Sequence, residues 1–216
     1  MRAESDIKRD VEAELRWSPE VDDTDIAVKV NGREVTLSGF TRSFWEKCKA
    51  ESLVRNVKGV AAVANDIAVR IPGSVPTDPE IARSAITALQ TDLPYSADKI
   101  RALVRDGRVS LEGTVEWQFQ REKAEEAVRR LPGVVSIRNS IRIEPSLVAD
   151  NIKHRIEDAF RRIAQVDADH IVVDTQGSEV TLRGEVRSWA ERDQAQRTAW
   201  SAPGVTNVKN ELAVHS

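Results

Sequence analysis

Three histidines are the side chains best suited to acid–base or metal chemistry near neutral pH. His154, His170 and His215 all fall in the last third of the 216-residue chain. Histidine acts in catalysis or metal binding only where partner side chains converge on it. The chain has no His-Glu-x-x-His pair, no Gly-x-Ser-x-Gly elbow and no glycine-rich phosphate loop. We therefore expect a protein that is not an enzyme and has no catalytic, cofactor-binding or metal-binding residues.

The single cysteine, Cys48, is the chain's other potential nucleophile. It lies within an expected helix among apolar positions, where a small buried hydrophobe is the simpler interpretation. One cysteine excludes an intrachain disulfide, and residues 1–10 are too charged for the apolar core of a secretory signal. No apolar run approaches the roughly 18–20 residues of a membrane span. These features predict a cytoplasmic protein.

Two groups of closely spaced aspartates are candidate calcium sites. They are Asp22, Asp23 and Asp25 in the first third of the chain, and Asp167 and Asp169 in the last third. Calcium requires about six oxygen ligands, usually with a glycine in the loop. Aspartates at a helix-to-strand bend more simply bond their own backbone in a turn. We favour the turn interpretation.

The tryptophans form the main candidate binding surface. The chain has five of them against one tyrosine. Three of them fall near the start of an expected helix, namely Trp45, Trp117 and Trp189. There they would suit contact with a lipid headgroup region or with a protein partner, because indole is apolar with one polar edge. The alternative is that they pack between neighbouring parts of the chain or cover a sheet. Trp17 and Trp200 are interpreted as core or junction residues.

The elements that position these residues come from one unit repeated three times. Each copy has a glycine after a short alternating apolar segment, and twenty residues later a Gly-Val pair. Six residues beyond that second glycine lies an asparagine, followed by alternating apolar positions. The first glycines are 74 and then 71 residues apart. The glycines expected to define the fold are Gly39, Gly59, Gly113, Gly133, Gly184 and Gly204.

Each unit begins with a predicted helix and a β-hairpin. Apolar residues recur every four positions in the helix, as at Ile7, Val11 and Leu15. A hairpin is indicated by Asn31-Gly32 between two alternating segments, with Asp106-Gly107 and Gln176-Gly177 at the same place in the other copies. Asn-Gly and Asp-Gly suit a type I′ turn, because both of its central residues need positive φ.

A second helix and a last strand complete the unit. Ser43 with Glu46 forms a capping box at the start of the helix, as does Ser188 with Glu191, whereas the middle copy lacks the serine. The helix is predicted to end at the second glycine in a left-handed cap. The strand that follows should run parallel to the second hairpin strand, because the helix makes a crossover connection.

The predicted fold class is therefore α+β, with three tandem α-β-β-α-β units. Each is a small three-stranded mixed sheet covered on one face by two helices. The units span residues 1–72, 77–145 and 146–216, with proline-rich joints between them.

This pattern resembles the BON domain of bacterial osmotically inducible and nodulation-related proteins, and the whole chain resembles the osmotically inducible protein Y family. The matching motifs are a Val-x-Leu-x-Gly strand and a Gly-Val-x-x-Val/Ile-x-Asn ending, each present three times. They fall at Val35–Gly39 and Gly59–Asn65, at Val109–Gly113 and Gly133–Asn139, and at Val180–Gly184 and Gly204–Asn210.

The resemblance implies a non-enzymatic, stress-associated binding protein that contacts phospholipid surfaces or an envelope or cytosolic protein. It also implies a periplasmic location as the alternative to the cytoplasm. A protein–protein scaffold or self-assembling module is the competing function, because a three-stranded sheet leaves two open edges. A net charge of −3 argues against nucleic acid as a partner and against strong electrostatic docking to membranes. No cofactor is expected, and the sequence leaves the oligomeric state open.

Overall fold

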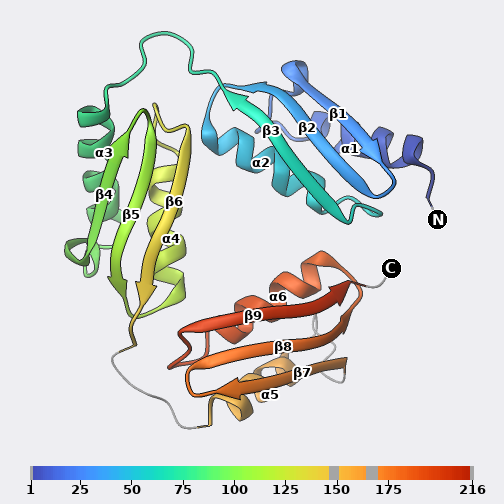
Figure 1. The fold of residues 1–216 in the computed structure, drawn as a ribbon, viewed down its shortest axis with the longest axis vertical. Helices are drawn as coiled ribbons and strands as arrows, with labels where there is room; N and C mark the ends of the chain where they lie inside the picture. The colour runs from blue at the N-terminus through green and yellow to red at the C-terminus, as the bar shows by residue number, and fades with distance from the viewer. Residues whose placement is uncertain (1, 146–150, 164–169, 215–216) are drawn as a thin grey trace. The chain divides into compact units, whose positions relative to one another are not determined.

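A computed structural model describes residues 2–145, 151–163 and 170–214 of the chain. Figure 1 shows one arrangement three times over, a helix, a two-strand hairpin, a second helix and a third strand. The strands of the described residues form three separate three-stranded mixed sheets, ordered β1-β2-β3, β4-β5-β6 and β7-β8-β9. The predicted α+β class and the three α-β-β-α-β units are confirmed.

In the first repeat, β1 pairs antiparallel with β2, and β3 pairs parallel with β2 on the other side. The parallel pairing follows from the helical crossover between β2 and β3. A one-turn 3₁₀ segment, Asp23–Asp25, leads into β1. The elements are α1 (Glu4–Trp17), β1 (Ile26–Asn31), β2 (Glu34–Thr41), α2 (Phe44–Arg55) and β3 (Ala62–Val69).

The other two repeats follow the same order. In the third, β7 pairs antiparallel and β9 parallel with the central β8. The second repeat comprises α3 (Asp78–Asp92), β4 (Ile100–Arg105), β5 (Arg108–Val115), α4 (Gln118–Arg129) and β6 (Ser136–Ile143). The third comprises α5 (Ile152–Arg162), β7 (Ile171–Gln176), β8 (Glu179–Val186), α6 (Trp189–Trp200) and β9 (Asn207–Val214).

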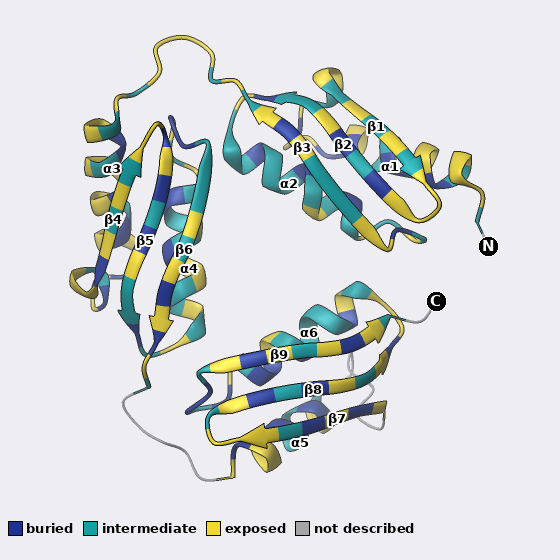
Figure 2. Cartoon of the chain, viewed as in Figure 1, coloured by how far each residue is buried: buried dark blue, intermediate teal, exposed yellow. Residues whose placement is uncertain are grey.

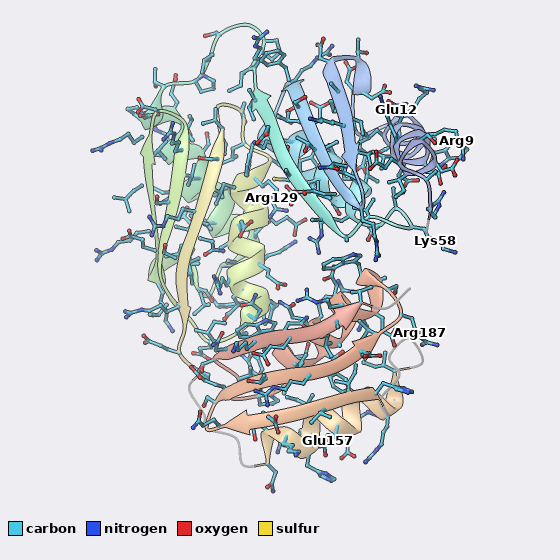
Figure 3. The ribbon with its side chains drawn as sticks, turned by 45° about the vertical axis from the view of Figure 1, so that its right-hand side comes forward. Arg9, Glu12, Lys58, Arg129, Glu157 and Arg187 are labelled. Atoms are coloured by element: carbon cyan, nitrogen blue, oxygen red, sulfur yellow. The ribbon has the colours of Figure 1, made fainter. Side chains whose placement is uncertain are left out.

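Each repeat has its own core between the helices and one face of its sheet (Figure 2). In β2, alternate side chains point inward, so Val35 and Leu37 are fully buried while their neighbours are not. The four-residue periodicity predicted for α1 matches its buried side, whereas charged residues such as Arg9 and Glu12 project from the outside of the helix (Figure 3). In the core of the third repeat, Phe160 occupies the position of Leu15.

The first glycine of each repeat is required by a close backbone approach. Gly39 has a φ of +113°, and a Cβ there would lie 1.9 Å from the carbonyl oxygen of Asp25 at the start of the paired strand. The corresponding distances are 2.0 Å at Gly113 and at Gly184. No side chain fits at such a separation, which explains why all three copies carry glycine here.

The hairpin turns differ in part from the prediction. The loop of the second repeat is Asp106-Gly107, and both residues have positive φ, as a type I′ turn requires. In the first repeat Asn31 belongs to the ladder opposite Glu34, so the two-residue loop is Gly32-Arg33 with positive φ only at the glycine. The third repeat does the same at Gly177. A single glycine at the first loop position is typical of a type II′ turn.

The role predicted for the second glycine was also wrong in one respect. Helix α2 ends at Arg55 with Asn56 as its C-cap, four residues before Gly59. Gly59 does have a positive φ, of +101°, but in the turn that follows the helix. A Cβ at Gly133, its counterpart, would lie 2.6 Å from Ile81 on α3. These glycines therefore allow the turn to pass closely against the first helix of the repeat.

The asparagine of each repeat joins the third strand to the second helix. The Asn65 side-chain amide donates to the carbonyl oxygen of Lys47, at 3.2 Å, and its side-chain oxygen accepts from the amide of Ile67. Asn139 makes the same two contacts with Arg121 and Ile141, and Asn210 with Arg192 and Leu212. A side chain with both a donor and an acceptor is needed for this bridge.

Candidate functional site: the aromatic end of each repeat

The segment after the first helix and the start of the second helix meet at one end of each repeat, which we call the aromatic end. In the first repeat, the backbone amide of Asp22 donates to Glu46 Oε1 at 2.7 Å. Two ion pairs join the same segments, Arg42 with Asp22 at 2.9 Å and Lys49 with Glu20 at 2.5 Å. The aromatic end is therefore a defined surface within a single repeat.

A buried polar side chain fixes this end. Glu46 is buried and accepts from the amides of both Asp22 and Arg42. In the second repeat Gln120 takes the corresponding position, accepting from two backbone amides and donating to Ser96 Oγ at 2.7 Å. Glu191, also buried, accepts from the amide of Arg187. The predicted capping boxes are confirmed in part. Ser43 and Ser188 accept from the amides of these glutamates, whereas the glutamates accept from the residue before each serine, Arg42 and Arg187.

The second repeat exposes the most aromatic surface at this end. Tyr95, in the segment after α3, is 96% exposed, and Phe119, in the first turn of α4, is 61% exposed. Trp117, immediately before α4, is 36% exposed. The bond from Gln120 to Ser96 ties the two segments that carry these rings. Three exposed aromatic side chains are thus carried by two segments that are tied together at one end of the repeat.

The tryptophans of the other repeats are less exposed. Trp45 and Trp189 are both half-buried, and the guanidinium carbon of Arg192 lies 5.3 Å from the Trp189 ring centroid. Trp17, at the end of α1, is 85% exposed, so the core interpretation of this residue was wrong. Trp200 packs against the core of the third repeat.

Charges at the aromatic end are nearly balanced. In the second repeat Lys99 faces Glu116 at 3.7 Å. In the first, Asp22 accepts from Thr24, which lowers the pKa of its carboxyl and keeps it anionic beside Arg42. These ion pairs therefore leave no charge of either sign uncompensated among the residues named.

The remaining candidates lie elsewhere or form no site. Asp22 accepts from the amide two residues on, so the turn interpretation of this acidic group is confirmed. Cys48 is half-buried, and burial raises the pKa of its thiol, which leaves it protonated at neutral pH. His154 lies on the exposed side of α5, 3.4 Å from Asp158. His215, Asp167 and Asp169 lie outside the described residues.

Among the described residues, the His, Cys, Asp and Glu side chains include no group of three or more that could hold a metal ion. None of the helices in this part of the chain is both long and apolar enough to cross a membrane.

Sequence reasoning missed Tyr95 and Phe119, which are more exposed than any of the three tryptophans it selected. It took no account of tyrosine, although Tyr95 lies in a Pro94-Tyr95-Ser96 segment typical of a surface turn. Phe119 lies where the first repeat has Trp45, so aligning the repeats would have revealed it.

A fold of three α-β-β-α-β repeats with aromatic ends defines a class of protein, and family comparison gives its name. The BON domain matches at residues 3–71, 77–145 and 148–216. The chain belongs to the BON domain family.

A curated relative is osmotically-inducible protein Y of Escherichia coli (strain K12), 30% identical over 148 residues, which are 64% of this chain and 72% of that protein. Among solved structures, the C-terminal domain of CdsD, a structural protein of the type III secretion system of Chlamydia trachomatis, matches over 100% of both chains at 13% identity with a TM-score of 0.27. That score is too low to support a structural argument.

Proposed function

We propose that this chain is a non-enzymatic, stress-associated binding protein that contacts phospholipid surfaces through the aromatic ends of its repeats. The supporting observation is the exposed group of Tyr95, Trp117 and Phe119 on one end of the second repeat. Tyrosine and tryptophan suit the interface between water and acyl chains, because each has an apolar ring and a polar group. Membership of the BON family and similarity to an osmotically inducible protein support the stress association.

The proposed contact is driven by apolar burial. Each ring that leaves water contributes on the order of 1–2 kcal/mol, so three rings together give useful affinity without net positive charge. Residues 73–145 carry a net charge of zero, which fits this mode. Binding to zwitterionic vesicles should therefore change little between about 50 and about 500 mM salt.

Co-sedimentation of the full chain with phosphatidylcholine vesicles tests the proposal. We expect wild-type protein in the pellet and at least tenfold weaker partitioning when Tyr95, Trp117 and Phe119 are replaced together by serine. The matched control replaces Leu103 and Ile86 by serine, because both are exposed apolar residues of the same repeat, on β4 and α3. Equal loss in the control, or no wild-type protein in the pellet, would reject lipid contact by this surface.

A protein–protein or self-assembling role is the second candidate. In each repeat taken alone, the first and third strands are the edges of the sheet, and edges are templates for pairing with another strand. Light scattering over a wide concentration range tests self-assembly, and a constant monomer mass would exclude it.

The predicted cytoplasmic location, with the periplasm as the alternative implied by the family, needs a separate test. Cell fractionation of the native protein distinguishes the two compartments. Both offer a phospholipid surface, so either outcome is compatible with the proposed contact.

A further inference from the structure

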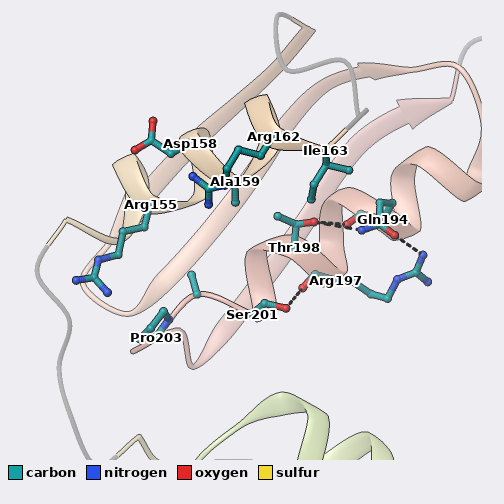
Figure 4. Close-up of a pocket in the computed structure, with 11 residues that line it drawn as sticks. Arg155, Asp158, Ala159, Arg162, Ile163, Gln194, Arg197, Thr198, Ser201 and Pro203 are labelled. Atoms are coloured by element: carbon teal, nitrogen blue, oxygen red, sulfur yellow. Dashed lines mark hydrogen bonds between the residues drawn. The ribbon is translucent and has the colours of Figure 1, made fainter. Parts of the chain in front are cut away.

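An open groove of about 660 Å³ runs between α5 and α6 of the third repeat (Figure 4). Three arginines line it, Arg155 and Arg162 from α5 and Arg197 from α6. The lining also includes small or apolar residues, Ala159 of α5, Ile163 immediately after α5, and Ala202 and Pro203 after α6. The groove thus combines an apolar floor with three permanent positive charges.

The arginines have unused hydrogen-bonding capacity. Within the described residues, the side chains of Arg155 and Arg162 make no hydrogen bond or ion pair. Arg197 uses one nitrogen, Nη2, to donate to Gln194 at 2.9 Å. The lining contains one acid, Asp158, whose carboxylate accepts from Arg161 at 3.2 Å and points away from α6 in Figure 4. Asp158 lies between Arg155 and Arg162 in sequence and offsets part of their charge, so the lining as a whole keeps a net positive charge of two.

Figure 4 shows Arg155 and Arg197 directed toward opposite sides of the groove, so a ligand that contacts both must be extended and carry more than one negative charge. Arg155 and Arg162 are seven residues apart, so they share a side of α5 about 10 Å apart along its axis. Guanidinium groups bind phosphate oxygens through paired N–H donors. The nearby hydroxyls of Thr198 and Ser201 already donate to helix carbonyls, so the arginines supply the donors. Phosphate chemistry fits this donor set.

The three arginines are specific to the third repeat. Positions of the third repeat lie 145 residues after their counterparts in the first repeat and 71 after those in the second, as Ile152 does after Ile7 and Ile81. The same spacings identify the counterparts of the three arginines. In the first repeat these are Asp10, Trp17 and Ser52, and in the second Ser84, Thr91 and Glu126. The common fold therefore does not require these arginines. Residues 146–216 carry a net charge of −2, so general basicity does not account for them either.

We propose that the groove between α5 and α6 binds a phosphate-bearing ligand with two or more negative charges, held by Arg155, Arg162 and Arg197. The ligand is either a soluble polyphosphate compound or the headgroup of an anionic lipid. The two proposed contacts differ in what drives them. The groove acts through salt-sensitive charge, whereas the proposed aromatic contact is insensitive to salt.

Calorimetric titration of the full chain with sodium tripolyphosphate tests the soluble source. We expect one saturable site, weakened about tenfold or more by Arg155→Gln or Arg162→Gln. Lys153→Gln is the matched control, because it removes the same charge from the same helix without touching the groove. It should change affinity by less than about twofold. Arg155→Lys should also weaken binding, because it keeps the charge but loses the paired donors.

Co-sedimentation with phosphatidylglycerol vesicles tests the lipid source, with the aromatic residues of the second repeat replaced by serine so that only the groove contributes. Binding of either probe that is lost in the Arg155 and Arg162 variants supports the site and identifies its ligand source. Absence of saturable binding to both probes, or equal weakening by Lys153→Gln, would overturn the proposal. Circular dichroism melts should be unchanged in all variants, because the replaced side chains are exposed.

Discussion

Replacing Glu46 by alanine should destabilise the first repeat and loosen its aromatic end. Its two carboxylate oxygens accept from the amides of Asp22 and Arg42, at 2.7 and 2.9 Å, and the side chain is buried. Hydrogen bonds to a charged group contribute about 1.5–3 kcal/mol each. Because Arg42 is exposed enough for water to replace part of its bond, we expect a net loss of about 2–3 kcal/mol.

Gln120 takes the place of Glu46 in the second repeat, so Glu46→Gln is a milder variant to compare with Glu46→Ala. An amide has one oxygen rather than two, so Glu46→Gln should keep one of the two bonds and lose about half as much stability. Glu14→Ala is the control, since this half-buried glutamate of α1 makes no side-chain hydrogen bond or ion pair to the rest of the described chain.

Hydrogen–deuterium exchange read by mass spectrometry is the suitable assay, because a chain of three repeats need not unfold in one step. A loss of 2–3 kcal/mol should speed exchange of the β2 amides by about 30- to 150-fold while the third repeat is unchanged. If Glu46→Ala exchanges no faster than Glu14→Ala, the carboxylate does not hold the two segments together.

Three further predictions concern the fold itself. Gly39→Ala should lower the free energy of unfolding by more than about 4 kcal/mol and unfold the first repeat. Gly32→Ala, with open space around its Cβ, should lower it by about 1 kcal/mol. Urea denaturation followed by circular dichroism compares the two variants, and equal losses of stability would contradict the contact with Asp25. Asn65→Ala should cost about 1–2 kcal/mol in the same assay, and no loss would mean that the bridge to α2 is not needed. Hydrogen bonds from Thr77 lower the pKa of Glu80 in the folded protein. The stability that Glu80 contributes is therefore present above its ordinary pKa of about 4 and is lost as the pH falls through the folded value. Thermal melts between about pH 2 and 6 should show a shallower loss of stability toward acid in Glu80→Gln than in the wild type, and identical slopes would refute this.

The fold followed from the sequence because local signals and the repeat agree. Valine and leucine at alternate positions before a glycine predict a strand with one buried face. Because the same segment occurs three times at nearly constant spacing, the assignment does not depend on one copy alone. The details that failed depend on atoms distant in sequence. The two-residue loop at Gly32 is set by ladder register, and the position of Gly59 reflects packing against α1.

The candidate site was predicted only in part, because exposure is a tertiary property. The start of the second helix was correctly placed, yet sequence alone could not tell that Trp45 is half-buried while Phe119 is exposed. Nor could it show that the segment carrying Tyr95 lies beside that helix start, because Gln120 and Ser96 are 24 residues apart. The arginine groove between α5 and α6 likewise arises only when two helices pack.

Paramagnetic broadening by a spin-labelled phosphatidylcholine in lipid bicelles reports which residues contact lipid. We expect selective loss of NMR signals from Tyr95, Trp117 and Phe119, while the exposed apolar residues Leu103 and Ile86 of the same repeat keep theirs. Broadening that is absent, or that affects Leu103 and Ile86 equally, would contradict lipid contact through the aromatic end.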